Sequence, residues 1–196
     1  MGRWQPDARG RLQLAALELY GEQGFEQTTV ADIAERAGVT ERTFFRHFAD
    51  KREVLFDGAS ELERRAVEAI LVAPPSCPPV EAVGAGMAAA AAPLDEVRDY
   101  SRLRAAAIAG HASLQERELL KLAALTAAAT AALHERGVPE PAATLAAEVG
   151  VAAFKVGFGW WIADDATDTL TACIRSALDQ LRALTSQPAT RAAADR

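Results

Sequence analysis

Residues 28–48 read TTVADIAERAGVTERTFFRHF, and the rest of the chain can be interpreted outward from this stretch. Thr29 is a favourable N-cap residue, and the apolar residues after it recur at the spacing of an α-helix. Gly38 follows that helix where a chain often needs a positive φ angle. Thr40 can then cap a second helix. Two short helices joined by a tight turn are typical of a helix-turn-helix, whose second helix fits the major groove of DNA.

The second helix of this motif has an inward apolar face and an outward polar face. Phe44 and Phe48, four residues apart, form the inward face, and Phe45 lies at its edge. The remaining positions carry Glu41, Arg42, Thr43, Arg46 and His47. Arg42 can pair with O6 and N7 of guanine, whereas Thr43 can contact a phosphate or a thymine methyl group.

This stretch closely resembles the DNA-binding region of TetR-family transcriptional regulators. The resemblance covers about residues 7–56 and rests on Gly24-Phe25, Thr28-Thr29-Val30, Ile33-Ala34, Ala37-Gly38-Val39, Thr43-Phe44-Phe45, His47-Phe48 and Lys51. It implies that His47 and Lys51 bind backbone phosphates. Phe45 departs from the family pattern, because the family usually has a tyrosine there with a phosphate-binding hydroxyl. Arg42 replaces a residue that is commonly small, so we expect an altered base preference.

The expected DNA-binding set combines both lines of reasoning. Thr29, at a helix N-terminus, can place its hydroxyl and backbone N–H groups on a phosphate. The full set is Thr29, Thr40, Arg42, Thr43, Phe45, Arg46, His47 and Lys51. A basic excess does not support it, because the net charge is −6 and residues 1–56 hold eight Lys and Arg against nine Asp and Glu. DNA binding therefore requires the basic side chains to gather on one surface.

Composition favours an all-α protein. Half of the 196 residues are hydrophobic, only 6% are aromatic, and no strand-like run is bounded by turn signals. The sequence has no uncharged apolar span of 18 residues and no signal-peptide core, so we expect a cytoplasmic protein with no membrane partner. Cys77 and Cys173 form no metal-type cluster, which favours free thiols in a reducing compartment.

We expect two domains. Residues 1–50 form a helix-turn-helix DNA-binding domain, with the motif at about 29–48, and residues 51–196 form a larger helical domain for ligand binding and dimerisation. The second domain begins with a linking helix at 51–72, started by a capping box of Asp50 and Glu53. Further helices are expected at about 80–91, 94–109, 114–136, 142–162 and 166–184, followed by a disordered tail at 186–196.

The C-terminal domain offers candidates for two further sites. Four aromatic residues concentrate at 154–161, where ordinary core packing, a dimer interface and a pocket wall are all open interpretations. The resemblance implies that the last two long helices pair with those of a second copy, with candidates Phe154, Trp160, Leu170, Ile174 and Leu178. It also implies an inducer pocket, with candidates Tyr100, Arg104, His111, Phe158 and Trp161. The polar members of that pocket belong to residue types that are more often solvated or salt-bridged side chains.

The sequence contains no nucleophile elbow, phosphate-binding glycine loop or metal-ligand spacing, so we expect no enzyme activity, catalytic residue, metal or cofactor. We expect a homodimer that binds a pseudo-palindromic operator in double-stranded DNA. The resemblance implies repression, relieved when a small-molecule effector changes the spacing of the two reading heads. The alternatives are a helical ligand-binding or interaction protein with a degenerate reading head, and an activator or ligand-independent regulator.

Overall fold

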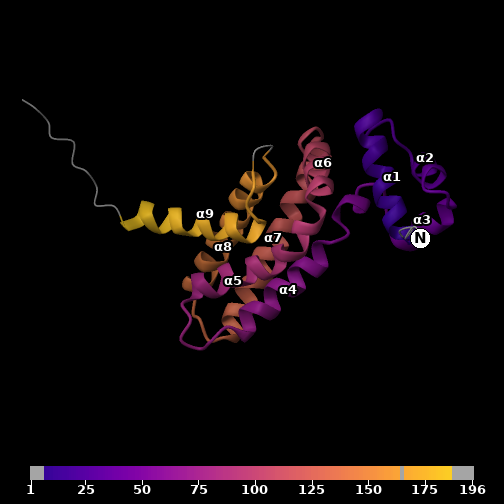
Figure 1. The fold of residues 1–196 in the computed structure, drawn as a ribbon. Coiled ribbons are helices and arrows are strands. Elements are labelled where there is room, and N and C mark those ends of the chain that lie inside the picture. The colour runs from indigo at the N-terminus through magenta and orange to yellow at the C-terminus, as the bar shows by residue number, and fades with distance from the viewer. Residues whose placement is uncertain (1–6, 164–165, 187–196) are drawn as a thin grey trace, which may run out of the picture.

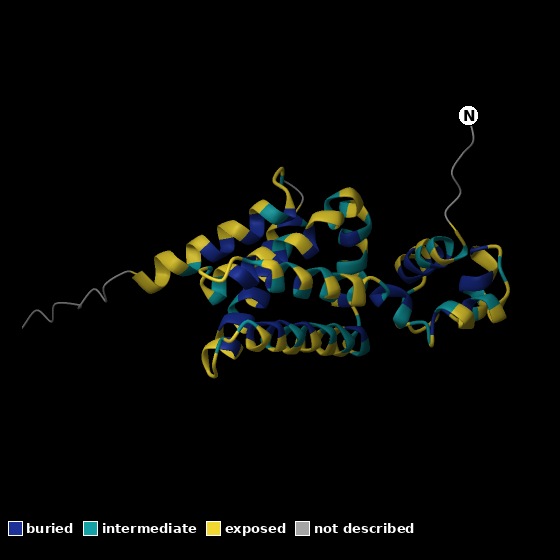
Figure 2. Cartoon of the chain, turned by 90° about the horizontal axis from the view of Figure 1, so that it is seen from below, coloured by how far each residue is buried: buried dark blue, intermediate teal, exposed yellow. Residues whose placement is uncertain are grey.

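A computed structural model describes residues 7–163 and 166–186, and these residues are helical throughout with no strand among them. A small N-terminal unit of three helices lies beside a larger bundle of six (Figure 1). Buried residues lie on the helix faces that point toward other helices, and exposed residues lie on the outer faces (Figure 2). The all-α prediction with a helix-turn-helix unit followed by a larger helical domain is therefore confirmed. Residues 187–196, most of the expected tail, lie outside the described residues.

The N-terminal unit consists of α1 (Ala8–Glu22), α2 (Val30–Arg36) and α3 (Glu41–His47). The predicted caps form, because Thr29 and Thr40 cap α2 and α3. At the start of α1, the Asp7 side chain accepts a hydrogen bond from the Gly10 amide. Gly38 has a φ angle of +66° in the turn between α2 and α3, a conformation that glycine adopts without steric cost. Local capping and turn chemistry thus build the helix-turn-helix.

The core of this unit is not confined to the three helices. Phe25, Phe44 and Phe48 are buried in it, as the sequence predicts, together with the apolar stripe of α1. The same buried cluster also contains residues 54–56 and two residues from the C-terminal bundle, Ile108 and Leu114. The core of the N-terminal unit, which we call the head, therefore includes side chains that come some fifty residues later in the sequence.

The expected continuous linking helix at 51–72 is wrong. The chain instead forms a 3-10 turn, η1 (Glu53–Phe56), passes Asp57 and Gly58, and only then enters α4 (Ala59–Val72). Side chains from neighbouring helices engage the chain at this break, because the Leu55 carbonyl accepts from Arg104 and the Asp57 carboxylate accepts from Gln13. These tertiary contacts, together with the low helix propensity of glycine, explain why one helix does not run through.

The expected capping box is also only half formed. The Asp50 carboxylate accepts from the backbone amides of Arg52 and Glu53, at 2.8 and 3.2 Å. The Glu53 carboxylate does not return to the backbone of Asp50, because it accepts from Arg117 and lies 3.8 Å from the ammonium of Lys121. Long-range charge pairing has replaced the local reciprocal bond.

The C-terminal bundle places its helices close to the expected positions. They are α5 (Pro79–Ala91), η2 (Ala92–Val97), α6 (Arg98–Ala109), α7 (Ala112–Glu135), α8 (Ala142–Trp161) and α9 (Leu170–Ser186). The segment expected at 94–109 becomes α-helical only from Arg98, and the last helix starts at Leu170 rather than near 166. The N–H group of Leu170 donates to the Asp95 carboxylate at 2.8 Å, which ties the start of α9 to η2.

The central helix of this bundle is α8, which packs on α5, α7 and α9. A Cβ atom at Gly157 would lie 2.8 Å from the backbone nitrogen of Ile174, so glycine allows α8 and α9 to approach backbone to backbone. Within the described residues, α8 is the one helix long and apolar enough to cross a membrane by length and composition, and it is partly buried inside the protein. Its contacts are those of a core helix.

Candidate nucleic-acid interface

The outward face of α3 presents two arginines and an aromatic ring. Arg42 and Arg46 are exposed, and the Phe45 ring is 56% exposed between them. Thr43 and His47 are half-buried at the sides of this face. Beneath it, Phe44 is wholly buried, so the core holds α3 in one orientation. The helix therefore offers a rigid surface of about two turns, which is the element that a major groove accommodates.

Threonine caps fix the starts of both helices of the motif. The Thr40 hydroxyl accepts from the Thr43 amide at 3.2 Å and lies 3.1 Å from the Thr43 hydroxyl. Thr29 forms a reciprocal capping box with Asp32: its hydroxyl accepts from the Asp32 amide, and its own amide donates to the Asp32 carboxylate. Hydrogen bonds from Thr29 lower the pKa of Asp32. The Asp32 carboxylate thus accepts from the Thr29 N–H group, which the sequence analysis expected to bind a phosphate. The Thr29 hydroxyl proton is still free to donate to a phosphate.

Lys51 has a structural role that sequence reasoning missed. Its ammonium donates to the backbone carbonyls of Phe25 at 2.8 Å and Thr28 at 2.9 Å, and more weakly to Glu26 at 3.3 Å. It also lies 4.3 Å from the centre of the Phe25 ring. All three ammonium protons therefore hold the loop between α1 and α2, so a phosphate contact at Lys51 requires an exchange of these partners.

Within the described part of the chain, some arginines of the head form ion pairs with carboxylates, whereas those on the outward face of α3 do not. Arg36 is paired with Glu18 and Glu22, at 3.2 and 2.8 Å. Among the described residues, Arg42 forms no ion pair, and the guanidinium of Arg46 lies 3.4 Å from the His47 ring. The acidic excess of residues 1–56 is thus partly neutralised away from α3, and the outward face of α3 keeps its positive charge. This arrangement meets the requirement for basic side chains gathered on one surface.

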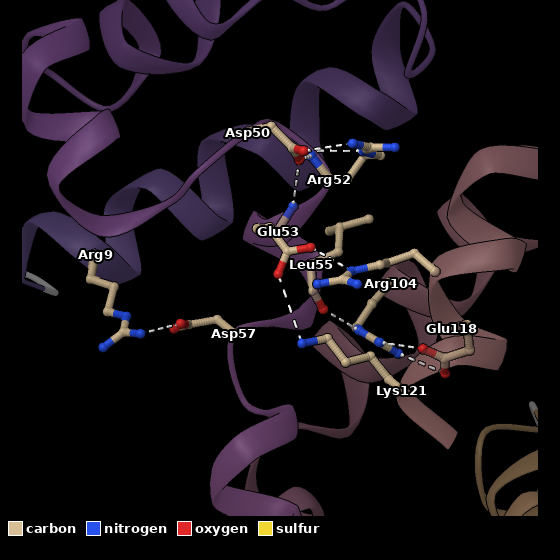
Figure 3. Close-up of polar contacts among 10 residues, drawn as sticks. Arg9, Asp50, Arg52, Glu53, Leu55, Asp57, Arg104, Glu118 and Lys121 are labelled. Atoms are coloured by element: carbon tan, nitrogen blue, oxygen red, sulfur yellow. Dashed lines mark hydrogen bonds and ion pairs between the residues drawn. The ribbon is translucent and has the colours of Figure 1, made fainter. Parts of the chain in front are cut away.

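A polar junction joins the head to the bundle (Figure 3). Arg104 of α6 donates to the Leu55 carbonyl, pairs with Glu118 of α7 at 2.8 Å and lies 5.0 Å from the Phe56 ring. Glu53 of η1 is paired with Arg117 and Lys121 of α7. We call this group, with Glu118, the head–bundle junction. It anchors the segment at residues 53–56 from two helices of the bundle.

The expected ligand pocket is not formed by the residues assigned to it. Tyr100, Arg104 and His111 lie at or near the head–bundle junction: Tyr100 packs on the head core, where burial raises its pKa, and the His111 ring nitrogen accepts from the Phe25 amide at 3.4 Å. Phe158 and Trp161 belong instead to the core of the bundle. Sequence spacing could not show this division, because it depends on which core each helix face meets.

Two open cavities occur elsewhere in the bundle. One, of about 220 Å³, lies between α7 and α8 and is lined by Leu119, Leu122, Ala123, Thr126, Glu148, Val151, Ala152 and Lys155. The other, of about 540 Å³, lies between α5 and α9. Neither cavity includes any of the five expected pocket residues. Thr126 and Lys155 are polar residues that line the first cavity.

The expected dimer residues are mostly core residues of a single chain. Leu170 and Ile174 are 0% exposed, and Leu178 and Phe154 are also buried. These four side chains pack against other helices of their own chain. Trp160 alone among the five remains exposed, at 38%. It ends an exposed stripe along α8 that we call the α8 stripe: Leu145, Ala152, Val156, Gly159 and Trp160.

Comparison with known proteins agrees with the architecture of the head. Residues 14–57, from α1 to the residue after η1, match the family model described as bacterial regulatory proteins, tetR family. The N-terminal unit of the chain is thus similar to the DNA-binding region of TetR-family regulators. The TetR-family match covers the two helices of the motif, their caps and the turn glycine, which are the features that build the outward face of α3.

A relative and two solved structures are similar to longer parts of the chain. The HTH-type transcriptional regulator TcmR of Streptomyces glaucescens is 42% identical over 91 residues, which are 46% of this chain and 39% of TcmR. This chain therefore spans less than half the length of that relative. A SmeT–triclosan complex has a TM-score of 0.64 at 20% identity, over 91% of each chain. FadR of Bacillus subtilis with stearoyl-CoA has a TM-score of 0.60 at 19% identity, over 88% of this chain and 96% of FadR. These structures share the fold of both units.

Among the described residues, no group of three His, Cys, Asp or Glu side chains is placed to hold a metal ion. Cys77 and Cys173 are free thiols. The interface described above consists instead of hydrogen-bond donors, cations and one aromatic ring on a capped helix. Such groups bind and orient a partner.

Proposed function

We propose that this protein is a sequence-specific DNA-binding transcriptional regulator that acts in the cytoplasm, most simply as a repressor. The observation that carries the proposal is the outward face of α3, where Arg42, Phe45 and Arg46 stand exposed on a helix fixed by its cap and its buried phenylalanines. Arginine is the commonest reader of guanine in the major groove. The family match over residues 14–57 and the regulator TcmR support the same function.

We propose that two copies bind a pseudo-palindromic operator. A dimeric helix-turn-helix protein places its two recognition helices in successive major grooves about 34–36 Å apart. The α8 stripe supports self-association, because it leaves Val156 45% and Trp160 38% exposed beside small residues that permit close helix packing. Trp160→Ala and Val156→Asp should shift the protein to monomers in sedimentation, whereas Leu103→Asp on the exposed face of α6 should leave its mass unchanged.

We further propose that a small-molecule effector in the bundle lowers operator affinity. Relatives with the same fold have been solved with stearoyl-CoA and with triclosan, which supports a ligand site in the helical domain. The head–bundle junction supports the coupling, because Arg104, Arg117 and Lys121 connect the chain at residues 53–56 to α6 and α7. A ligand acts only through its difference in affinity for the DNA-competent and DNA-incompetent forms.

The test of DNA binding is selection of duplexes from a random pool with the purified protein, followed by titration at two salt concentrations. We expect an enriched inverted repeat, with affinity that falls steeply as salt rises. Arg42→Ala should relax base preference, whereas Arg65→Ala, at a half-buried arginine on α4, should leave it unchanged. Bulk binding without an enriched sequence would contradict the proposal and favour a ligand-binding protein with a degenerate head.

A further inference from the structure

The aromatic ring of Phe45 is held in a defined position on the outside of the head. It is 56% exposed, although burial of a phenylalanine ring is favoured. It meets the buried Phe44 ring edge to face, with centroids 5.4 Å apart and an interplanar angle of 82°. Phe44 and Phe48 fill the core beneath α3, so the Phe45 ring has no space there. The ring therefore projects as a fixed apolar group.

The neighbours of Phe45 limit what it can recognise. Arg42 and Arg46 are exposed on the same helix, three residues before and one residue after it. These guanidinium groups suit phosphates and guanines, but the ring carries no hydroxyl and cannot bond a phosphate. The apolar group that a base pair presents in the major groove is the 5-methyl group of thymine. Its contact would bury the part of the ring that now faces solvent.

Resting on the DNA-binding function proposed above, we infer that Phe45 reads the 5-methyl group of a thymine close to a guanine read by Arg42. Side chains three residues apart on a helix have Cβ atoms about 5–6 Å apart. Successive bases on one strand are about 3.4 Å apart along the helix axis. The two bases therefore lie within about two base pairs of each other in each half-site. Phe45 is thus a specificity-determining residue for a T·A pair, and its ring takes no part in phosphate binding.

The test uses the full-length protein and the duplex selected from the random pool. Each thymine of one half-site is replaced in turn by deoxyuridine, which removes the methyl group and keeps every hydrogen-bonding atom. We expect affinity to fall about fourfold at one thymine, the contribution of one buried carbon group. Phe45→Ala should weaken binding to the parent duplex by about tenfold or more and should no longer distinguish thymine from uracil. Phe45→Tyr, which keeps the ring, should retain the discrimination.

The possible outcomes test the thymine-reading role of Phe45 separately from the DNA-binding function on which it rests. Equal affinity of the wild-type protein for all thymine and uracil duplexes would overturn the inference while leaving specific DNA binding in place. A fourfold effect that persists in Phe45→Ala would also overturn it, because another side chain would then read the methyl group. Failure to enrich any duplex would overturn the proposed function together with the inference. Both variants should have the melting temperature of the wild type, because the Phe45 ring is largely exposed.

Discussion

Replacing Arg104 by methionine tests whether the head–bundle junction stabilises the head. Methionine keeps an unbranched apolar stem beside Phe56 but leaves the Leu55 carbonyl and the Glu118 carboxylate without their guanidinium partner. Hydrogen bonds to charged groups are worth about 1.5–3 kcal/mol, and a buried acceptor left unpaired costs about 1–3 kcal/mol. The side chains of Arg104 and Glu118 are 19% and 31% exposed, so solvent screening reduces the ion-pair share. We expect a loss of about 2 kcal/mol.

Urea unfolding monitored by circular dichroism measures this loss of unfolding free energy. Thermal unfolding gives a second readout: at about 2–4 °C per kcal/mol for a chain of this size, the melting temperature should fall by about 4–8 °C. The matched control is Arg64→Met on α4, whose guanidinium forms only exposed ion pairs with Glu61 and Glu68 and should change stability little. A loss for Arg104→Met no larger than that of the control would refute the reasoning, since the junction would then add nothing beyond surface charge pairing.

Three further predictions concern packing, capping and pH. Gly157→Ala should lower the melting temperature by forcing α8 and α9 apart, whereas Gly21→Ala on α1, with nothing within 4 Å of the added carbon, should maintain or raise it. Thr40→Ala should cost about 1 kcal/mol of unfolding free energy by removing the α3 cap, and an unchanged urea midpoint would contradict this role. The side-chain bond from Arg52 lowers the pKa of Asp50, so its stabilisation is present above about pH 4 and lost as pH falls through the lower folded-state pKa. The stability difference between the wild type and Asp50→Asn should therefore shrink below pH 4 in urea titrations.

The parts of the head that the sequence predicts are those fixed by neighbours in the chain. Thr29 and Thr40 bond amides three residues away, and Gly38 serves a turn of a few residues, so their roles follow from local rules. For Lys51, the resemblance implies a phosphate contact. In the folded chain Lys51 holds carbonyls some 25 residues earlier, including that of Phe25. No local pattern carries that information.

The placement of residues in the bundle escaped sequence reasoning for a related cause. Helical spacing shows that Ile174 and Leu178 share an apolar stripe of α9, but it does not show which surface covers that stripe. The chain covers it with its own α8 and α5, and the α8 stripe stays exposed. The linking helix failed for the same reason, because the contact of Arg104 with the Leu55 carbonyl joins residues 49 positions apart.

The shared core of the head has a consequence for building chimaeras. A designer who grafts the head of this protein onto the bundle of another regulator would cut the chain near Gly58, after the last head residue. Such a graft leaves behind Ile108 and Leu114, which complete the head core from α6 and α7. The recipient must supply side chains of matching volume at those two positions, or the grafted head keeps its recognition helix but loses part of the packing that holds it. The transferable unit is therefore discontinuous: a segment ending near residue 57 and a patch some fifty residues further along the chain.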